Sequence, residues 1–151
     1  MVRISFNKTS KRNTLHLKEF YRDAGDGPGS GKKVMCAILH TLPDYVKYIT
    51  VDASGGKDEM NTRKWWFQKD KRTFANWKQP QILRWLEEHQ VSPGFIPVVL
   101  QSNTKSWLRI LASNEKLVKY YEKLGFRRVD KYLLPVVKMT GTVEHIKKSC
   151  S

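Results

Sequence analysis

The chain has 151 residues, enough for one domain with a single hydrophobic core. Apolar residues make up 40% of it and aromatic residues 11%, which argues against intrinsic disorder. Lysine and arginine outnumber acidic residues by 28 to 14, and the resulting net charge of +14 favours anionic partners such as nucleic acid, an anionic cofactor or an acidic protein surface.

The first half of the chain alternates between strand and helix patterns. Val2–Phe6 is typical of a short strand, and Thr14–Tyr21 has the period of two of a longer one. In this second strand Leu15, Leu17 and, by extension, Glu19 are expected on one face. A glycine-rich turn over residues 24–31 follows and leads into a helix pattern.

That helix is predicted over Lys32–Leu42 from its apolar spacing, and Pro43 ends or bends it. Tyr48–Val51 is β-branched and short, as in a buried strand. Cys36 lies in the helix pattern and forms no metal-ligand spacing with Cys150, so we predict a buried free thiol and no metal site. A reducing, intracellular location in the cytoplasm or nucleus fits this expectation.

The second half begins at a turn over residues 52–59 and contains an atypical insert at about 55–105. Within it, Arg63–Lys78 interleaves aromatic rings with basic side chains, which is typical either of a small apolar core under a charged surface or of a surface that holds phosphates and stacks bases. The other elements expected from the pattern are a helix over Pro80–Gln90, strands over Phe95–Leu100 and Trp107–Leu111, a helix over Asn114–Leu124 and a final strand over Tyr132–Met139. The order predicts one α/β domain over residues 1–151.

The glycine-rich turn has three interpretations. It can be a connecting loop that binds nothing. It also looks like a nucleotide-binding loop, but Asp26 takes the place of the first glycine and Lys33 that of the hydroxyl which ligates Mg²⁺. In the third interpretation, Gly29-Ser-Gly31 before an amphipathic helix cradles an anion such as a phosphate group, because glycine allows close backbone approach and the helix start presents free N–H groups.

A second motif favours the third interpretation. The residues from Asn114 through Tyr121 to Gly125-Phe126 resemble the signature of the GCN5-related N-acetyltransferase (GNAT) family, which contains an asparagine, a tyrosine and a terminal Lys-Leu-Gly-Phe at similar spacing. The resemblance covers about 14–53 and 106–139. It implies a mixed central sheet that is splayed in its middle and flanked by helices, with acetyl-coenzyme A bound in the splay.

The resemblance also implies roles for individual residues. Gly29, Ser30, Gly31, Lys32 and Lys33 would bind the coenzyme pyrophosphate, and Asn114 would fix the coenzyme or the helix start. The pantetheine arm would pair with the strand near 20–23. Tyr121 would act as the general acid that protonates the departing thiolate. Glu19 is the position-matched candidate for the general base, and His16 on the same strand is a second candidate.

Two departures from the family pattern leave a second function open. Fewer residues precede the glycine loop than in the family, so we expect an acetyltransferase fold shortened at its N-terminus, and the insert has no family counterpart.

The leading expectation is an N-acetyltransferase that acts on an amine of a protein or of another acidic or nucleic-acid-associated acceptor. The alternative is a non-enzymatic scaffold in a larger assembly, such as a virion-type protein, that binds nucleic acid. Its basic side chains would be Arg63, Lys64, Lys69, Lys71, Arg72 and Lys78. Neither reading predicts contact with a membrane.

Overall fold

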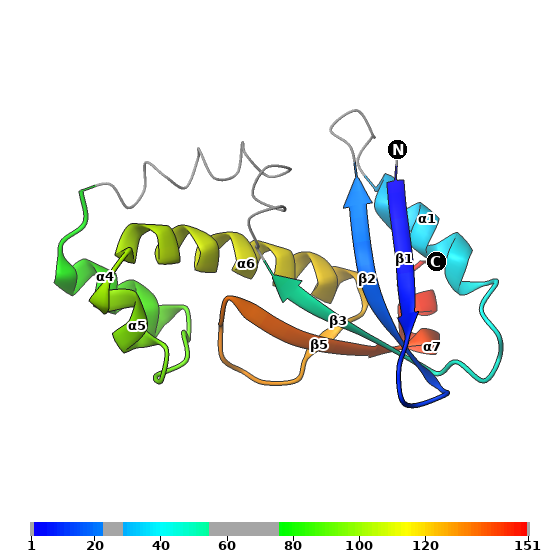
Figure 1. The fold of residues 1–151 in the computed structure, drawn as a ribbon. Coiled ribbons are helices and arrows are strands. Elements are labelled where there is room, and N and C mark those ends of the chain that lie inside the picture. Colours follow the sequence, from blue (N-terminus) through cyan, green and yellow to red (C-terminus); the bar gives the residue numbers. More distant parts are fainter. Residues whose placement is uncertain (1, 23–28, 55–75, 151) are drawn as a thin grey trace. The chain divides into compact units, whose positions relative to one another are not determined.

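The computed structural model describes residues 2–22, 29–54 and 76–150 (Figure 1). Its strands are β1 (Val2–Lys8), β2 (Thr14–Arg22), β3 (Tyr48–Ser54), β4 (Arg127–Arg128) and β5 (Val136–Thr142). Its helices are α1 (Ser30–Leu39), α4 (Gln79–Glu88), α5 (Ile96–Gln101), α6 (Thr104–Leu124) and α7 (Val143–Lys148). The strands form one mixed sheet in the order β1-β2-β3-β5-β4, which confirms the predicted α/β class with a mixed sheet flanked by helices.

The chain separates into two compact units. The sheet unit consists of 1–52, 120–129 and 138–151, and the helical unit of 53–119 and 130–137. The sheet unit contains β1, β2, α1, β4, α7 and the greater part of β3 and β5. The helical unit contains α4, α5 and most of α6. No described helix has the length and apolar character that crossing a membrane requires.

The strand directions differ along the sheet. β1 and β2 form an antiparallel hairpin, and β4 and β5 are also antiparallel. β2 and β3 (Figure 1) run parallel, and their register pairs Thr14 with Tyr48 and Leu17 with Val51. A parallel pair needs a crossover connection, and α1 lies in that connection. The predicted sequence of strand, helix and strand over this region is therefore confirmed.

A β-bulge in β2 changes which side chains face the helices. Ser5 pairs with Glu19 and Phe6 with Leu17, so Lys18 is an extra residue on β2. Beyond this bulge Phe20 lies on the same side as Leu17, where its ring meets tyrosine rings of α6. The expectation that Glu19 shares a face with Leu15 and Leu17 is wrong: Glu19 is exposed.

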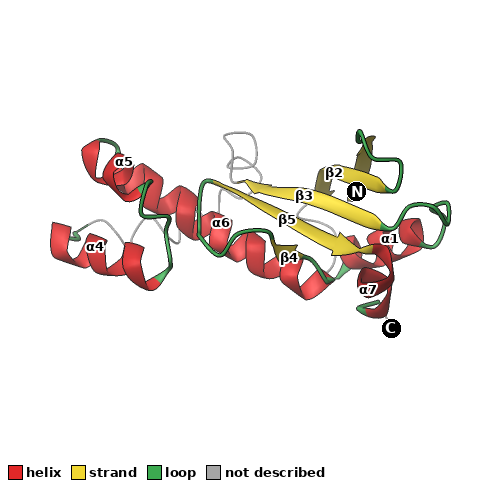
Figure 2. Cartoon of the chain, turned by 90° about the horizontal axis from the view of Figure 1, so that it is seen from below, coloured by secondary structure: helices red, strands yellow, loops and turns green. Residues whose placement is uncertain are grey.

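The buried face of the sheet carries aliphatic side chains at alternate positions of β3 and β5. In β3 these are Ile49, Val51 and Ala53, and in β5 Val137 and Met139. Figure 2 shows β3 and β5 side by side in the sheet. The opposite face carries polar and partly exposed side chains at the intervening positions, since successive residues of a strand point to opposite faces. The sheet unit thus has one apolar face and one open, polar face.

Helices α1 and α7 are joined by a disulfide between Cys36 and Cys150, whose Cα atoms are 6.0 Å apart. The prediction of a free buried thiol at Cys36 is therefore wrong, because folding brings together two cysteines that are 114 residues apart in the sequence. The reducing compartment was inferred from that free thiol, so the disulfide removes the reason for it. Helix α7 also packs through the buried side chain of Ile146, which lies close to Gly125 and Gly141.

The helical unit has its own buried residues on α4, α5 and α6. Leu86, Val99, Leu108 and Leu111 are fully buried. Two strand predictions in this part are wrong. Phe95–Leu100 falls largely in α5, whose first turn contains Pro97, and Trp107–Leu111 lies inside α6. The predicted helix over Asn114–Leu124 exists as the second half of this longer helix.

Candidate functional site

The start of α1 requires glycine at two positions. Gly29 precedes the helix with a φ of 79°, in the left-handed region that side chains rarely adopt. Gly31 is buried, and a Cβ atom there would lie 2.7 Å from Cε1 of Phe20 and 3.1 Å from the hydroxyl oxygen of Tyr120. Gly31 of the predicted phosphate-binding turn therefore brings the backbone against the side chains of Phe20 and Tyr120.

The first turn of α1 also holds the other predicted coenzyme residues. The Lys33 amide donates to the carbonyl oxygen of Gly29 at 3.0 Å, so the amides before it have no acceptor inside the helix. The Ser30 hydroxyl oxygen is buried and has no hydrogen-bond partner among the described residues. Lys32 is half-buried and Lys33 is exposed. Residues 23–28, which hold the rest of the turn, lie outside the described part of the chain.

An aromatic cluster lies on the helix side of β2. The ring of Phe20 meets the ring of Tyr120 at a centroid distance of 5.9 Å and that of Tyr121 at 6.3 Å. Tyr121 also packs edge-on against Phe126 at 5.6 Å. Tyr121 is 6% exposed, whereas Tyr120 is 38% exposed and its hydroxyl is the one near Gly31. Tyr121, the predicted general acid, thus lies in this aromatic cluster beside β2, the strand that precedes the glycine turn.

Asn114, predicted to fix the coenzyme or the helix start, is a fully buried residue of the helical unit. Its amide nitrogen donates to the carbonyl oxygen of Leu134 at 2.6 Å, and its side-chain oxygen is buried without a described partner. Because α6 begins at Thr104, Asn114 cannot cap the helix start, and that part of the prediction is wrong. Its role toward a coenzyme stays a prediction.

The two candidate bases both lie on the polar side of β2. Glu19 is exposed there. Nδ1 of His16 is 2.8 Å from the hydroxyl oxygen of Thr50 on β3, and Nε2 is 3.9 Å from Oδ2 of Asp52. His16 is 30% exposed and Asp52 46% exposed. The sequence suggested His16 alone; its two partners follow from the parallel register of β2 and β3, for which the sequence contains no signal.

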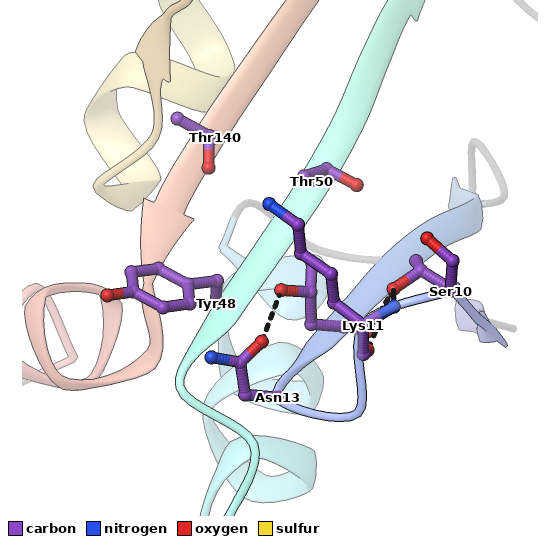
Figure 3. A pocket seen from close by; sticks show the side chains of 8 residues that line it. Ser10, Lys11, Asn13, Tyr48, Thr50 and Thr140 are labelled. Atoms are coloured by element: carbon purple, nitrogen blue, oxygen red, sulfur yellow. Dashed lines mark hydrogen bonds between the residues drawn. The ribbon is translucent and has the colours of Figure 1, made fainter.

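A pocket of about 530 Å³ opens on the same polar side of the sheet unit (Figure 3). We call it the hydroxyl pocket; its lining residues are Thr9, Ser10, Lys11, Asn13, Thr14, Tyr48, Thr50 and Thr140. Figure 3 shows the Lys11 side chain extending from the β1–β2 turn toward Thr50. No local motif in the sequence predicts this pocket, because its residues come from the turn, β2, β3 and β5.

The turn that supplies half of the hydroxyl pocket is held by its own hydrogen bonds. The Thr9 hydroxyl donates to the carbonyl oxygens of Lys11 and Thr14, at 2.9 and 2.8 Å. The Asn13 carbonyl oxygen accepts from the amides of Lys47 and Tyr48, which ties the turn to the start of β3. These bonds fix the backbone that positions Lys11 and Asn13.

A second histidine–carboxylate pair lies in the helical unit. His89 Nδ1 is 2.7 Å from Oε2 of Glu115, and the His89 ring stacks on Trp85 with centroids 4.1 Å apart. No local spacing predicts this pair, because Glu115 is 26 residues from His89 in the chain. The pair links the end of α4 to α6, and we interpret it as a structural contact.

The predicted nucleic-acid surface lies mostly outside the described residues. Arg63, Lys64, Lys69, Lys71 and Arg72 belong to the segment 55–75. Lys78 is exposed just before α4, where its backbone amide donates to the side chain of Gln81 at 2.8 Å. Comparisons with family models, with curated proteins and with solved structures found no match to this chain.

Proposed function

We propose that the chain is an acetyl-coenzyme A-dependent N-acetyltransferase of the GNAT type. The observation that carries the proposal is the contact between Gly31 and the aromatic cluster, because it joins the two motifs of the resemblance. The helix start that would bind pyrophosphate and the tyrosine pair of α6 meet at Phe20, on the strand that would bind the pantetheine arm.

The strand arrangement is consistent with this proposal. The parallel register joins Thr14–Leu17 to Tyr48–Val51, and β2 continues beyond it to Arg22, paired with β1. If β2 and β3 share a register at one end and then separate, they would provide the splay that an acetyltransferase requires. The backbone N–H and C=O groups of β2 after the bulge would then bond to an amide of the pantetheine arm.

The proposed chemistry is direct acyl transfer. The acceptor amine attacks the thioester carbonyl carbon, the new C–N bond forms and the C–S bond breaks. Tyr121 would return a proton to the thiolate as it leaves. First-turn amides of α1 and the charge of Lys32 and Lys33 would hold the pyrophosphate, as helix N-termini do for phosphates generally.

The proposal is tested by thermal unfolding with acetyl-coenzyme A, Mg-ATP and a DNA duplex in parallel. A ligand at a hundred times its Kd stabilises the native state by about 2.7 kcal/mol. For a chain of this size that corresponds to a rise in Tm of roughly 5–10 °C. Acetyl-coenzyme A should give this rise and Mg-ATP should not. Absence of a shift at millimolar acetyl-coenzyme A would refute the proposal.

Two variants locate the site. Lys33→Ala should weaken the coenzyme shift, whereas Lys148→Ala, an equal change of charge on the exposed end of α7, should not. Tyr121→Phe should leave the coenzyme shift intact and lower turnover by about 100-fold, the lower range of general acid catalysis. An unchanged turnover would remove Tyr121 from the mechanism.

The second candidate is a basic scaffold without catalysis that binds nucleic acid. The net charge of +14 favours it, together with the exposed Arg127 and Arg128 of β4. Binding of a DNA duplex should then weaken steeply as the salt concentration rises, because each neutralised phosphate releases counterions. Affinity that does not change between about 50 and 200 mM salt would exclude this candidate.

A further inference from the structure

The two most exposed aromatic rings among the described residues lie close together in the sequence, where the chain enters β3. Tyr45 is 48% exposed and Tyr48 is 44% exposed. Between them Val46 is buried, so it anchors the segment while both rings stay in solvent. Exposed apolar surface that gathers in one place commonly marks a binding surface. The flat faces of these two rings are therefore candidates for contact with a partner.

Cationic side chains accompany both rings. The guanidinium carbon of Arg12 lies 4.5 Å from the centroid of the Tyr45 ring, and Lys11 lines the hydroxyl pocket together with Tyr48 (Figure 3). Lys47 is exposed between the two tyrosines in the sequence. Among the described residues, no carboxylate forms an ion pair with any of these three cations. We call the five residues Lys11, Arg12, Tyr45, Lys47 and Tyr48 the basic turn surface.

Backbone hydrogen bonds hold the two segments of the basic turn surface against each other. The carbonyl oxygen of Asn13 accepts from the amides of Lys47 and Tyr48, at 2.8 and 3.0 Å. The carbonyl oxygen of Lys47 accepts from the amide of Val143, at 2.9 Å, which ties the same segment to the end of β5. Figure 1 shows the β1–β2 turn and the start of β3 at the same end of the sheet. A partner would therefore meet a surface whose backbone is already ordered, which lowers the entropic cost of binding.

The basic turn surface is distant from the proposed coenzyme site. It lies at the start of β2, whereas the glycine turn follows the end of that strand at Arg22. The nine residues of β2 span about 26 Å at the usual rise of a strand. A ligand at the basic turn surface therefore does not occupy the start of α1.

We propose that the basic turn surface binds single-stranded nucleic acid. Tyr45 and Tyr48 stack with unpaired bases, and Lys11, Arg12 and Lys47 hold the phosphates between them, the combination by which proteins bind single strands. A duplex offers phosphates but keeps its bases stacked on one another, and an acidic protein surface offers carboxylates without planar bases. The rings therefore favour a single strand over both. This binding does not require acetyl-coenzyme A, so it goes beyond the proposed function.

Fluorescence anisotropy of the full chain tests the contribution of the rings. The probes are a labelled oligothymidylate of about 16 nucleotides, the upper site size of a small single-strand-binding domain, and a duplex of the same length. The single strand should bind at least about tenfold more tightly than the duplex, since stacking on even one ring is worth that much. Tyr45→Ala and Tyr48→Ala should each weaken single-strand binding by about tenfold and leave duplex binding nearly unchanged.

A larger ring provides the matched control for these variants. Tyr48→Trp keeps a stacking surface and should bind the single strand at least as tightly as the wild type. Because both tyrosines are largely exposed, all three variants should melt near the wild-type Tm. Equal affinities of the single strand and the duplex, or wild-type affinity in both alanine variants, would overturn the proposal.

The salt dependence of the same titration tests the cations. For single strands, each phosphate neutralised contributes about 0.7 to the slope of log K against log salt concentration. Lys11→Ala and Lys47→Ala should each make the slope shallower by about 0.7, whereas the tyrosine variants should leave it unchanged. Lys148→Ala removes the same charge from α7 and should alter neither the slope nor the affinity. If Lys148→Ala weakens binding as much as Lys11→Ala does, the overall charge of the chain attracts the strand, and the proposed surface is wrong.

Two further measurements exclude other sites and other partners. Lys33→Ala removes one charge at the start of α1 and should leave single-strand affinity unchanged; a greater loss than in Lys11→Ala would place the strand at the glycine turn and refute the surface. Polyglutamate should displace the oligothymidylate only at a concentration of charged groups at least about tenfold higher, because it cannot stack. Displacement at equal concentrations of charge would identify an acidic protein as the partner and overturn the proposal.

Discussion

The disulfide between α1 and α7 makes a quantitative prediction about stability. Cys36 and Cys150 are 114 residues apart, so the bond closes a loop over most of the chain. In the chain-entropy account, a loop of this length lowers the entropy of the unfolded state enough to stabilise the fold by about 4.8 kcal/mol at 25 °C. Native disulfides measured in other proteins contribute about 2–5 kcal/mol, so we expect reduction to cost about 3–5 kcal/mol.

Other contacts of α7 determine how the reduced protein behaves. The Ser149 hydroxyl donates to the carbonyl oxygens of Leu124 and Ile146, at 2.9 and 2.6 Å. Ile146 is 1% exposed, and the Thr142 hydroxyl accepts from the His145 amide at the helix start. These contacts do not depend on the disulfide. We therefore expect the reduced protein to fold with α7 in place and to melt at a lower temperature.

The assay is thermal or urea unfolding with and without a reductant. For a chain of this size, 1 kcal/mol shifts the Tm by about 2–4 °C, so reduction should lower the Tm by roughly 6–20 °C. Cys150→Ser should have the lower Tm under both conditions and should not respond to the reductant. A wild-type protein with two titratable thiols before reduction, or with a Tm that the reductant leaves unchanged, would refute the reasoning.

Three further predictions follow from the described contacts. Gly31→Ala should lower the free energy of unfolding by about 1–3 kcal/mol, because its Cβ would meet the ring of Phe20 at 2.7 Å; urea titration measures this. Gly125→Ala should cost about 1–3 kcal/mol because φ is 108°, whereas Gly94→Ala, which meets nothing within 4 Å, should change stability little; equal effects in the two would contradict this account. Glu115→Ala should cost about 1–3 kcal/mol in the same assay, since it removes the acceptor of a partly buried hydrogen bond at 2.7 Å; a neutral result would show that the bond adds nothing.

Periodicity predicted the elements whose pattern is regular over their whole length. The period of two in Thr14–Tyr21 and the helical spacing of Lys32–Leu42 both correspond to observed elements, β2 and α1. Phe95–Leu100 is a short apolar run, and such a run fits a strand or a buried helix equally well by pattern alone. Trp107–Leu111 has the same ambiguity until it is read together with the helical pattern that follows it in α6.

The features that the sequence did not predict depend on residues distant in the chain. The Cys36–Cys150 bond joins the first helix to the last, and the contact of His16 with Thr50 needs the register of two parallel strands. No local spacing encodes either. The candidate site divides in the same way: the glycines of the turn were found from their own pattern, whereas the hydroxyl pocket required the folded chain.

The bulge at Lys18 has a consequence for comparing this chain with others. In a strand without a bulge, residues two apart lie on the same face, so an alignment without gaps preserves the inward and outward positions. Here the inward positions shift by one after Lys18, and Phe20 instead of Glu19 reaches the helices. A related chain that lacks the extra residue would need a one-residue gap at this point, and an ungapped alignment would match its buried positions to solvent-facing ones. In the strand that would bind the pantetheine arm, a sequence profile without this gap would therefore assign buried and exposed positions wrongly after the bulge.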